Sequence, residues 1–180
     1  VVLAAGHTER FNPAVVAALP LVSNPRFIEV HRLGTFPERS LDIDVIFDLM
    51  INDMDIVLDL VQSGVRSVSS VGLPILSSKI DIANARIEFQ NGCVANLTAS
   101  RVSTEKVRKL RFFQPNQYVS LDYTRQDVVV LTVRPGEGPA GTPPPAHGCR
   151  PAPGPGPGVR RGRLRARGHR SPRARRPARG

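Results

Sequence analysis

The sequence predicts an α+β domain in which a large, mostly antiparallel open sheet carries its helices on one face. Helical patterns occur only in the first third of the chain, consecutive strand-like segments follow them, and tight-turn residues join several of these segments. Composition sets the limit of the domain. Acidic and basic residues balance up to residue 134, and the whole formal net charge of +10 lies beyond it.

A short helix and a half-buried strand are predicted first. Asn12 followed by Pro13 is typical of a helix start, because Asn caps free backbone amides and proline loses no hydrogen bond at the first helical position. We expect this helix to run through Ala18. Residues 26–33 alternate between apolar and polar side chains, which predicts a strand with one buried face.

A longer helix is predicted over about residues 41–63. Apolar residues recur there at helical spacing, Ser40 precedes them, and Gly64 follows as a favourable left-handed cap. The segment is long enough to cross a bilayer, but it carries six aspartates. Charged side chains are costly in lipid, so no membrane partner is expected.

Strands make up the rest of the predicted domain, at residues 65–71, 80–89, 93–101, 107–113, 118–123 and 127–133. Asn91-Gly92 is the strongest hairpin signal, because both residue types tolerate the positive φ of a tight turn. Pro115-Asn116 and Thr124-Arg125 supply the next turns. Several consecutive strands with short connections favour a mostly antiparallel sheet.

Residues 135–180 form a tail of different composition. Pro, Gly, Arg and Ala fill 38 of its 46 positions, so it buries too little apolar surface to offset the entropy of ordering, and we expect it to be disordered. Its arginines could neutralise phosphates, but it has no Lys, aromatic residue or helical period, so nucleic acid is not an expected partner. The abrupt change at Arg134 also fits a GC-rich gene read in a shifted frame.

Cys93 and Cys149 give no disulfide framework and stand at no zinc-ligand spacing, which favours a reducing cytoplasm and predicts no metal site. The first residues, Val1 to Ala5, lack an initiator Met and a basic amino-terminal region. We interpret them as an interior strand of a longer protein rather than as a signal peptide.

Three segments together resemble the Gfo/Idh/MocA family of oxidoreductases. They are Gly-His-Thr-Glu-Arg-Phe-Asn-Pro at residues 6–13, Glu-Val-His-Arg at 29–32, and Asp-Leu-Met-Ile-Asn-Asp-Met-Asp at 48–55. The resemblance implies that residues 1–10 are the last strand and exit of a Rossmann domain that binds NAD(P). Residues 11–134 then form the carboxy-terminal, substrate-side domain, and residues 135–180 take no part.

The resemblance implies that the full-length protein uses NAD or NADP to oxidise or reduce a hydroxyl of a sugar or nucleotide-sugar. The family's glycine-rich loop and Glu-Lys-Pro motif do not occur in this sequence, so we expect the chain alone to bind the cofactor weakly and to be inactive. The resemblance also implies a homo-oligomer that forms through the open sheet face, where the expected polar contacts are Asn84, Arg86, Glu88, Asn96, Thr98 and Ser100.

The family's catalytic pattern on the long helix is Asp-x-x-x-His, and the matching residues here are Asp48 and Asn52. A spacing of four places both side chains on one helix face. An amide does not titrate near neutral pH and cannot accept the hydroxyl proton. The alternative to a dehydrogenase is therefore an inactive oligomerisation or ligand-binding module of the same fold, since a row of aspartates is also typical of a solvated helix face.

The resemblance makes His7 and Arg10 candidate cofactor contacts. Equally, His7 could satisfy a buried hydrogen bond, and Arg10 could pair with Glu9 or a helix carboxylate. His31 and Arg32 are candidate substrate contacts, and because they are neighbours on a strand, at most one of them faces a pocket.

Four cations, Lys106, Arg108, Lys109 and Arg111, cluster in one predicted strand. They could bind a phosphate, but a solvated sheet edge rich in Lys is the commoner reason for such a cluster. We therefore leave them outside the predicted site.

Overall fold

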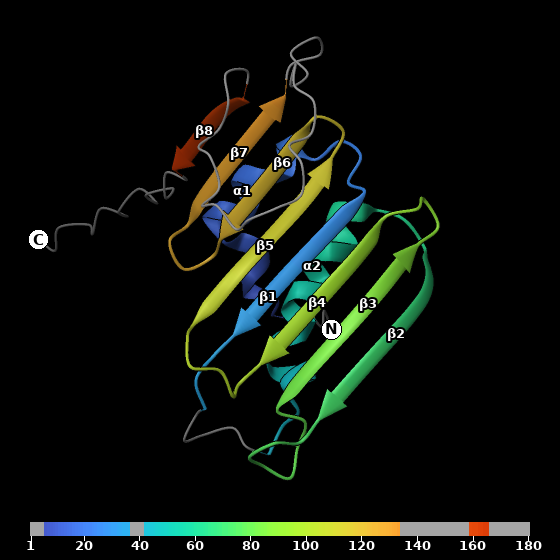
Figure 1. Cartoon of the computed structure of the whole chain (residues 1–180), viewed down its shortest axis with the longest axis vertical. Coiled ribbons are helices and arrows are strands. Elements are labelled where there is room, and N and C mark those ends of the chain that lie inside the picture. Colours follow the sequence, from blue (N-terminus) through green and yellow to red (C-terminus); the bar gives the residue numbers. More distant parts are fainter. Residues whose placement is uncertain (1–5, 37–41, 134–158, 166–180) are drawn as a thin grey trace, which may run out of the picture.

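The computed structural model describes residues 6–36, 42–133 and 159–165. Within them, one eight-stranded open sheet carries the helices on a single face (Figure 1), which confirms the predicted fold class. The strand expected at residues 1–5 lies outside the described residues, as do residues 37–41 and most of the tail.

The sheet has the strand order β2-β3-β4-β1-β5-β6-β7-β8. Neighbouring strands are antiparallel except β1 and β4, which pair in parallel from Phe27↔Val94 to Leu33↔Ser100. The first strand in the chain is therefore central in the sheet. The strands are β1 Phe27–Leu33, β2 Val65–Leu73, β3 Ile82–Phe89, β4 Val94–Ser100, β5 Val107–Gln114, β6 Gln117–Asp122, β7 Asp127–Val133 and β8 Val159–Arg165.

The helix layer contains α1 (Pro13–Ala18) and α2 (Ile51–Val61), together with the short 3₁₀ turns η1 (Thr8–Phe11) and η2 (Leu19–Leu21). The predicted start of α1 is confirmed: the Oδ1 of Asn12 accepts a hydrogen bond from the Ala14 amide at 3.0 Å, and Pro13 is the first helical residue. None of the helices among the described residues is long and apolar enough to span a membrane.

The long helix differs from the prediction at both ends. It begins as a π-turn, η3 (Ile46–Met50), in which the Ile51 amide bonds to the Ile46 carbonyl, and α2 continues from it. Residues 42–44 are not helical. At the carboxyl end, Gln62 takes the left-handed conformation, with φ 47° and ψ 42°, that was expected of Gly64.

The predicted turns lie where expected, but of the Asn91-Gly92 pair only Gly92 takes positive φ. Gly92 (φ 83°) does so at the β3–β4 hairpin, while the Asn91 side chain accepts a hydrogen bond from the Cys93 amide. Asn116 (φ 59°) turns the chain between β5 and β6, and Gln126 (φ 54°), not Thr124 or Arg125, has positive φ before β7.

The core lies between the helix layer and one face of the central strands. Its fully buried side chains include Ile28, Val30, Ile56, Val57, Leu97, Leu110, Phe112, Val119 and Leu121. Burial alternates strictly along β1, so its even-numbered residues face the helices. Every residue of β2, the edge strand, is exposed.

The structure also differs from the sequence prediction inside the tail. There β8 pairs antiparallel with β7, from Val159↔Val133 to Arg165↔Asp127 (Figure 1). Composition could not show this pairing, because a sheet ladder is formed by backbone groups and the exposed edge of β7 offers them whatever the side chains are.

Candidate functional site

A cavity of about 290 Å³ lies where the carboxyl ends of the parallel strands β1 and β4 meet the π-turn and the start of β5. Six of the nine residues that line it carry polar side chains. The lining residues are Arg32, Leu33, Gly34, Thr35, Asp48, Leu49, Arg101, Lys106 and Arg108. Each comes from the end of a strand, from the π-turn or from a connecting segment, so the sheet holds several chain-distant polar groups at one place.

Asp48 lies in the π-turn η3 and its exposed side chain lines the cavity. A π-turn inside a helix is often found at functional sites, because the extra residue displaces side chains from their regular positions. Asn52 follows on the first turn of α2 and is half-buried, but it is not one of the lining residues. The structure therefore brings Asp48 to the cavity and leaves Asn52 next to it on the helix.

Arg32 points into the helix layer and forms a buried ion pair with Asp53. Its Nε and Nη2 donate to the two Asp53 oxygens at 2.6 and 2.8 Å, and its Nη1 donates to the Oε1 of Glu9 at 3.1 Å. The guanidinium carbon also lies 5.2 Å from the centre of the Tyr123 ring. These bonds join η1, through Glu9, and α2, through Asp53, to the central strand β1. The two carboxylates also neutralise the charge of Arg32.

Burial and pairing act in opposite directions on this pair. Burial lowers the pKa of Arg32, but the bonds to Asp53 and Glu9 outweigh it and the pKa is raised. Burial raises the pKa of Asp53 and the bonds from Arg32 oppose the rise. The two short bonds of this bidentate contact support an Arg32–Asp53 pair in which both side chains are ionised at neutral pH.

Tyr123 is buried against this pair, and its hydroxyl has no hydrogen-bond partner among the described residues. Burial raises its pKa well above the ordinary value, and the negative charge of Asp53 adds to the rise. The hydroxyl is therefore neutral, and it could donate a proton only at high cost.

Arg10 bonds to a helix carboxylate, which was one of its two predicted roles. Its Nε and Nη2 donate to Asp55 at 2.9 and 2.7 Å, and its Nη1 lies 3.8 Å from Asp59. The hydrogen bond from Arg10 is the main cause that lowers the pKa of Asp55, and the charge of His7 also lowers it. His7 is half-buried.

His31 and Arg32 lie on opposite faces of β1, as the strand period predicts. Arg32 lines the cavity, and His31 lies on the open face of the sheet. The structure thus does not bring His31 together with Asp48.

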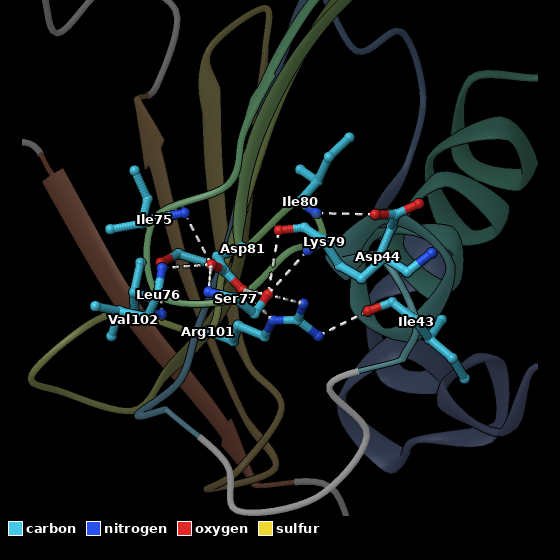
Figure 2. Close-up of polar contacts among 11 residues, drawn as sticks. Ile43, Asp44, Ile75, Leu76, Ser77, Lys79, Ile80, Asp81, Arg101 and Val102 are labelled. Atoms are coloured by element: carbon cyan, nitrogen blue, oxygen red, sulfur yellow. Dashed lines mark hydrogen bonds and ion pairs between the residues drawn. The ribbon is translucent and has the colours of Figure 1, made fainter.

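A second buried ion pair was not found from the sequence. The Nε of Arg101 donates to the Oδ1 of Asp81 at 2.7 Å, and both side chains are almost completely buried. Figure 2 shows how Asp81 also accepts hydrogen bonds from the loop that follows β2, through the Ile75, Leu76 and Ser77 amides at 2.7 to 2.8 Å. No spacing in the sequence signals this arrangement, because the two partners lie 20 residues apart, Asp81 just before β3 and Arg101 just after β4.

The Arg101–Asp81 pair fixes the segment that leads into the π-turn. The Nη1 of Arg101 donates to the Ile43 carbonyl at 2.7 Å, and the Ile80 amide donates to the Asp44 side chain at 2.8 Å (Figure 2). Burial tends to raise the pKa of Asp81, but hydrogen bonds from Ser77, Ile75 and Arg101 hold it well below its usual range. The segment that leads to Asp48 is therefore bonded to the residues that flank β3 and β4.

Lys106 and Arg108, which the sequence analysis left outside the site, line the cavity. The nearest acid to Arg108 is Glu9, whose Oε1 lies 3.6 Å from the Arg108 Nη1. Within the described part of the chain, no group of three or more His, Cys, Asp or Glu side chains is placed to hold a metal ion.

The chain is similar to a UDP-N-acetylglucosamine 3-dehydrogenase from Acidithiobacillus ferrooxidans, with 44% identity over 123 residues. The match covers 68% of this chain and 39% of the relative. A solved structure of the enzyme of that name from the same organism superposes with a TM-score of 0.74 at 38% identity, over 91% of this chain and 48% of that one. The chain thus spans less than half the length of these relatives.

A more distant solved structure, a levoglucosan dehydrogenase in complex with NADH, has a TM-score of 0.65 at 14% identity. The superposition covers 73% of this chain and 43% of the levoglucosan dehydrogenase, and it shows that the two share a fold. No family model matches the chain.

Proposed function

Because the chain is homologous to one domain of the Gfo/Idh/MocA-type oxidoreductases, we propose that it supplies the substrate-side domain of an NAD(P)-dependent oxidoreductase. The proposed reaction is oxidation or reduction of one hydroxyl of a nucleotide-sugar. The observation that carries this proposal is the position of Asp48, a residue of the family's catalytic pattern, in the wall of the cavity where the carboxyl ends of β1 and β4 meet the start of β5.

Oxidation of a carbon–hydroxyl group separates into two transfers. A bound nicotinamide would accept the hydride from the carbon, and a base beside the hydroxyl would take its proton. This chain provides the wall that orients the sugar: Thr35 and Asp48 offer hydrogen-bonding groups, and Leu33 and Leu49 offer apolar surface. The Asn52 amide can hold a hydroxyl but cannot take its proton, so the proton leaves through Asp48 or solvent, and we expect slow turnover.

An inactive ligand-binding module of the same fold is the second candidate. One observation favours it: Asn52 replaces the proton-accepting His of the family's pattern. The two candidates share the cavity and differ only in turnover, so a kinetic measurement separates them.

We also propose that two copies associate through the open face of the sheet. That face carries a packed aromatic row, with ring centres 5.9 Å apart for Phe27 and Phe113 and 5.1 Å apart for Phe113 and Tyr118. Beside it, Asn84 donates to Thr98 across β3 and β4 at 2.9 Å. Sedimentation equilibrium tests the proposal: a dimer that Phe113→Asp dissociates supports it, and a monomer at high concentration contradicts it.

The proposed reaction is tested with a chimera in which this chain replaces the matching segment of the A. ferrooxidans relative. Formation of reduced nicotinamide from UDP-N-acetylglucosamine and NAD⁺ is followed, with the unmodified relative as the positive control. Turnover that is slow, saturable and dependent on the sugar nucleotide supports the oxidoreductase. A folded chimera that binds the sugar nucleotide without any turnover supports the ligand-binding module instead.

A further inference from the structure

We propose that Lys106 and Arg108 form an anion-binding site at the mouth of the cavity and that this site takes the diphosphate of a nucleotide-sugar. The choice of a nucleotide-sugar rests on the proposed function. The site itself rests on the positions of the two cations and on what they contact.

The four cations that line the cavity divide into two kinds. Arg32 and Arg101 are buried and fully engaged, since their side chains are 4% and 2% exposed and each bonds to a buried aspartate. Such guanidinium groups cannot turn toward a ligand without breaking a buried pair, which is strongly destabilising. They form the floor of the cavity and do not provide free charge.

Lys106 and Arg108 are different. Within residues 6–36, 42–133 and 159–165, no hydrogen bond or ion pair engages the exposed Lys106 ammonium. Arg108 is 41% exposed, and its 3.6 Å approach to Glu9 is longer than the 3.1 Å bond that Arg32 makes to the same oxygen. Both cations therefore present N–H donors to an incoming anion.

Their place in the sheet gives no structural reason for this charge. Lysines protect the exposed edges of sheets, but Arg108 lies in β5 and Lys106 directly precedes it, and β5 lies inside the sheet, between β1 and β6. Residues two apart on an extended chain share a face at a spacing of about 7 Å, so Lys106 and Arg108 can each contact a different phosphate group. Arginine and lysine are the usual partners of phosphates.

A second hollow of about 260 Å³ shares these two cations with the cavity and is lined also by Glu105, Val107, Lys109, Asp122, Thr124 and Arg125. Lys106 and Arg108 line both spaces. A nucleotide-sugar has the matching order of parts, because its diphosphate joins a sugar to a nucleoside. The sugar then lies beside Asp48, the diphosphate on the two cations, and the nucleoside over Thr124 and Arg125.

The test is calorimetric titration of the chain with UDP-N-acetylglucosamine, UDP and uridine. UDP should bind and uridine should not, and UDP binding should weaken with added salt. Each charge-assisted contact is worth about tenfold in affinity or more, so the double variant Lys106→Gln/Arg108→Gln should lose about a hundredfold for UDP. Both side chains are partly or fully exposed, so its melting temperature should match that of the unmodified chain.

Arg111→Gln is the matched control. Arg111 lies on β5, as Arg108 does, and also carries one positive charge, but it faces the open side of the sheet, where it contacts Glu29 at 3.4 Å. It should leave the UDP affinity unchanged. An equal loss in this control, no loss in the double variant, or no binding of UDP by the chain would overturn the proposal.

This experiment is independent of turnover. UDP binding that depends on Lys106 and Arg108, in a chimera without turnover, contradicts the oxidoreductase and leaves the anion site standing. Turnover of UDP-N-acetylglucosamine with a Michaelis constant that the double variant does not change contradicts the anion site alone.

Discussion

Replacing Asp53 by Asn should destabilise the fold severely, because it removes the charge that neutralises the buried Arg32. The Asp53 and Arg32 side chains are 2% and 4% exposed, and two bonds of 2.6 and 2.8 Å join them. Breaking one partner of a buried pair costs about 3–5 kcal/mol, because the other charge is left without compensation. The Glu9 carboxylate and the Tyr123 ring stay next to Arg32 and should recover about 1 kcal/mol of this.

The expected net loss is therefore about 2–4 kcal/mol in the free energy of unfolding. With a urea dependence of about 2 kcal/mol per molar, the unfolding midpoint should fall by about 1–2 M. Urea unfolding followed by circular dichroism measures it. The double variant Arg32→Met/Asp53→Leu removes both charges and fills the space with apolar atoms, so it should be close to the unmodified protein in stability.

Two results would refute this reasoning. A midpoint shift below about 0.3 M for Asp53→Asn would show that Arg32 reaches water or another acid. A double variant that loses the sum of its two single variants would show that each side chain acts by itself and that the pair does not exist.

Three further substitutions test other parts of the structure. Tyr123→Phe should stabilise the fold by about 1 kcal/mol, because the buried hydroxyl has no partner, and a lower melting temperature would show that it has one. Asp81 has a folded-state pKa below its unfolded value, so the unfolded chain binds more protons and stability is lost as the pH falls below about 4. The Asp81→Asn variant lacks this carboxylate, so its urea midpoint should fall less steeply between about pH 5 and pH 2. The same slope in the variant and the unmodified chain would contradict this. Gln62→Gly should stabilise by about 1 kcal/mol, because Gln62 stands at φ 47°, and an unchanged urea midpoint would contradict the strain.

The sheet could be predicted from the sequence because its signals are local. Alternation along β1 and turn residues such as Gly92 and Asn116 act within a few residues, and they gave the strands to within a residue or two. The helix start at Asn12 is equally local. The pairing of β8 with β7 depends on a free sheet edge and on backbone groups, and neither is written in the composition of the tail.

The site was only partly predictable, because it depends on which strands become neighbours. Asp48 was found through its motif, but Lys106 and Arg108 were assigned to a sheet edge, and only the pairing of β5 with both β1 and β6 places them at the cavity. Arg101 and Asp81 meet across β4 and the loop after β2, which no spacing predicts.

Turnover of the Asn52→His variant of the chimera tests most directly whether this helix faces the reacting hydroxyl. An imidazole there can accept the proton, and such general-base help is worth about a hundredfold to ten-thousandfold in rate. The turnover number should rise by about that factor while the Michaelis constant changes little, and adding Asp48→Asn should remove most of the gain. No gain from His, or a gain that survives Asp48→Asn, would contradict the assignment of Asp48 and Asn52 to the reacting centre.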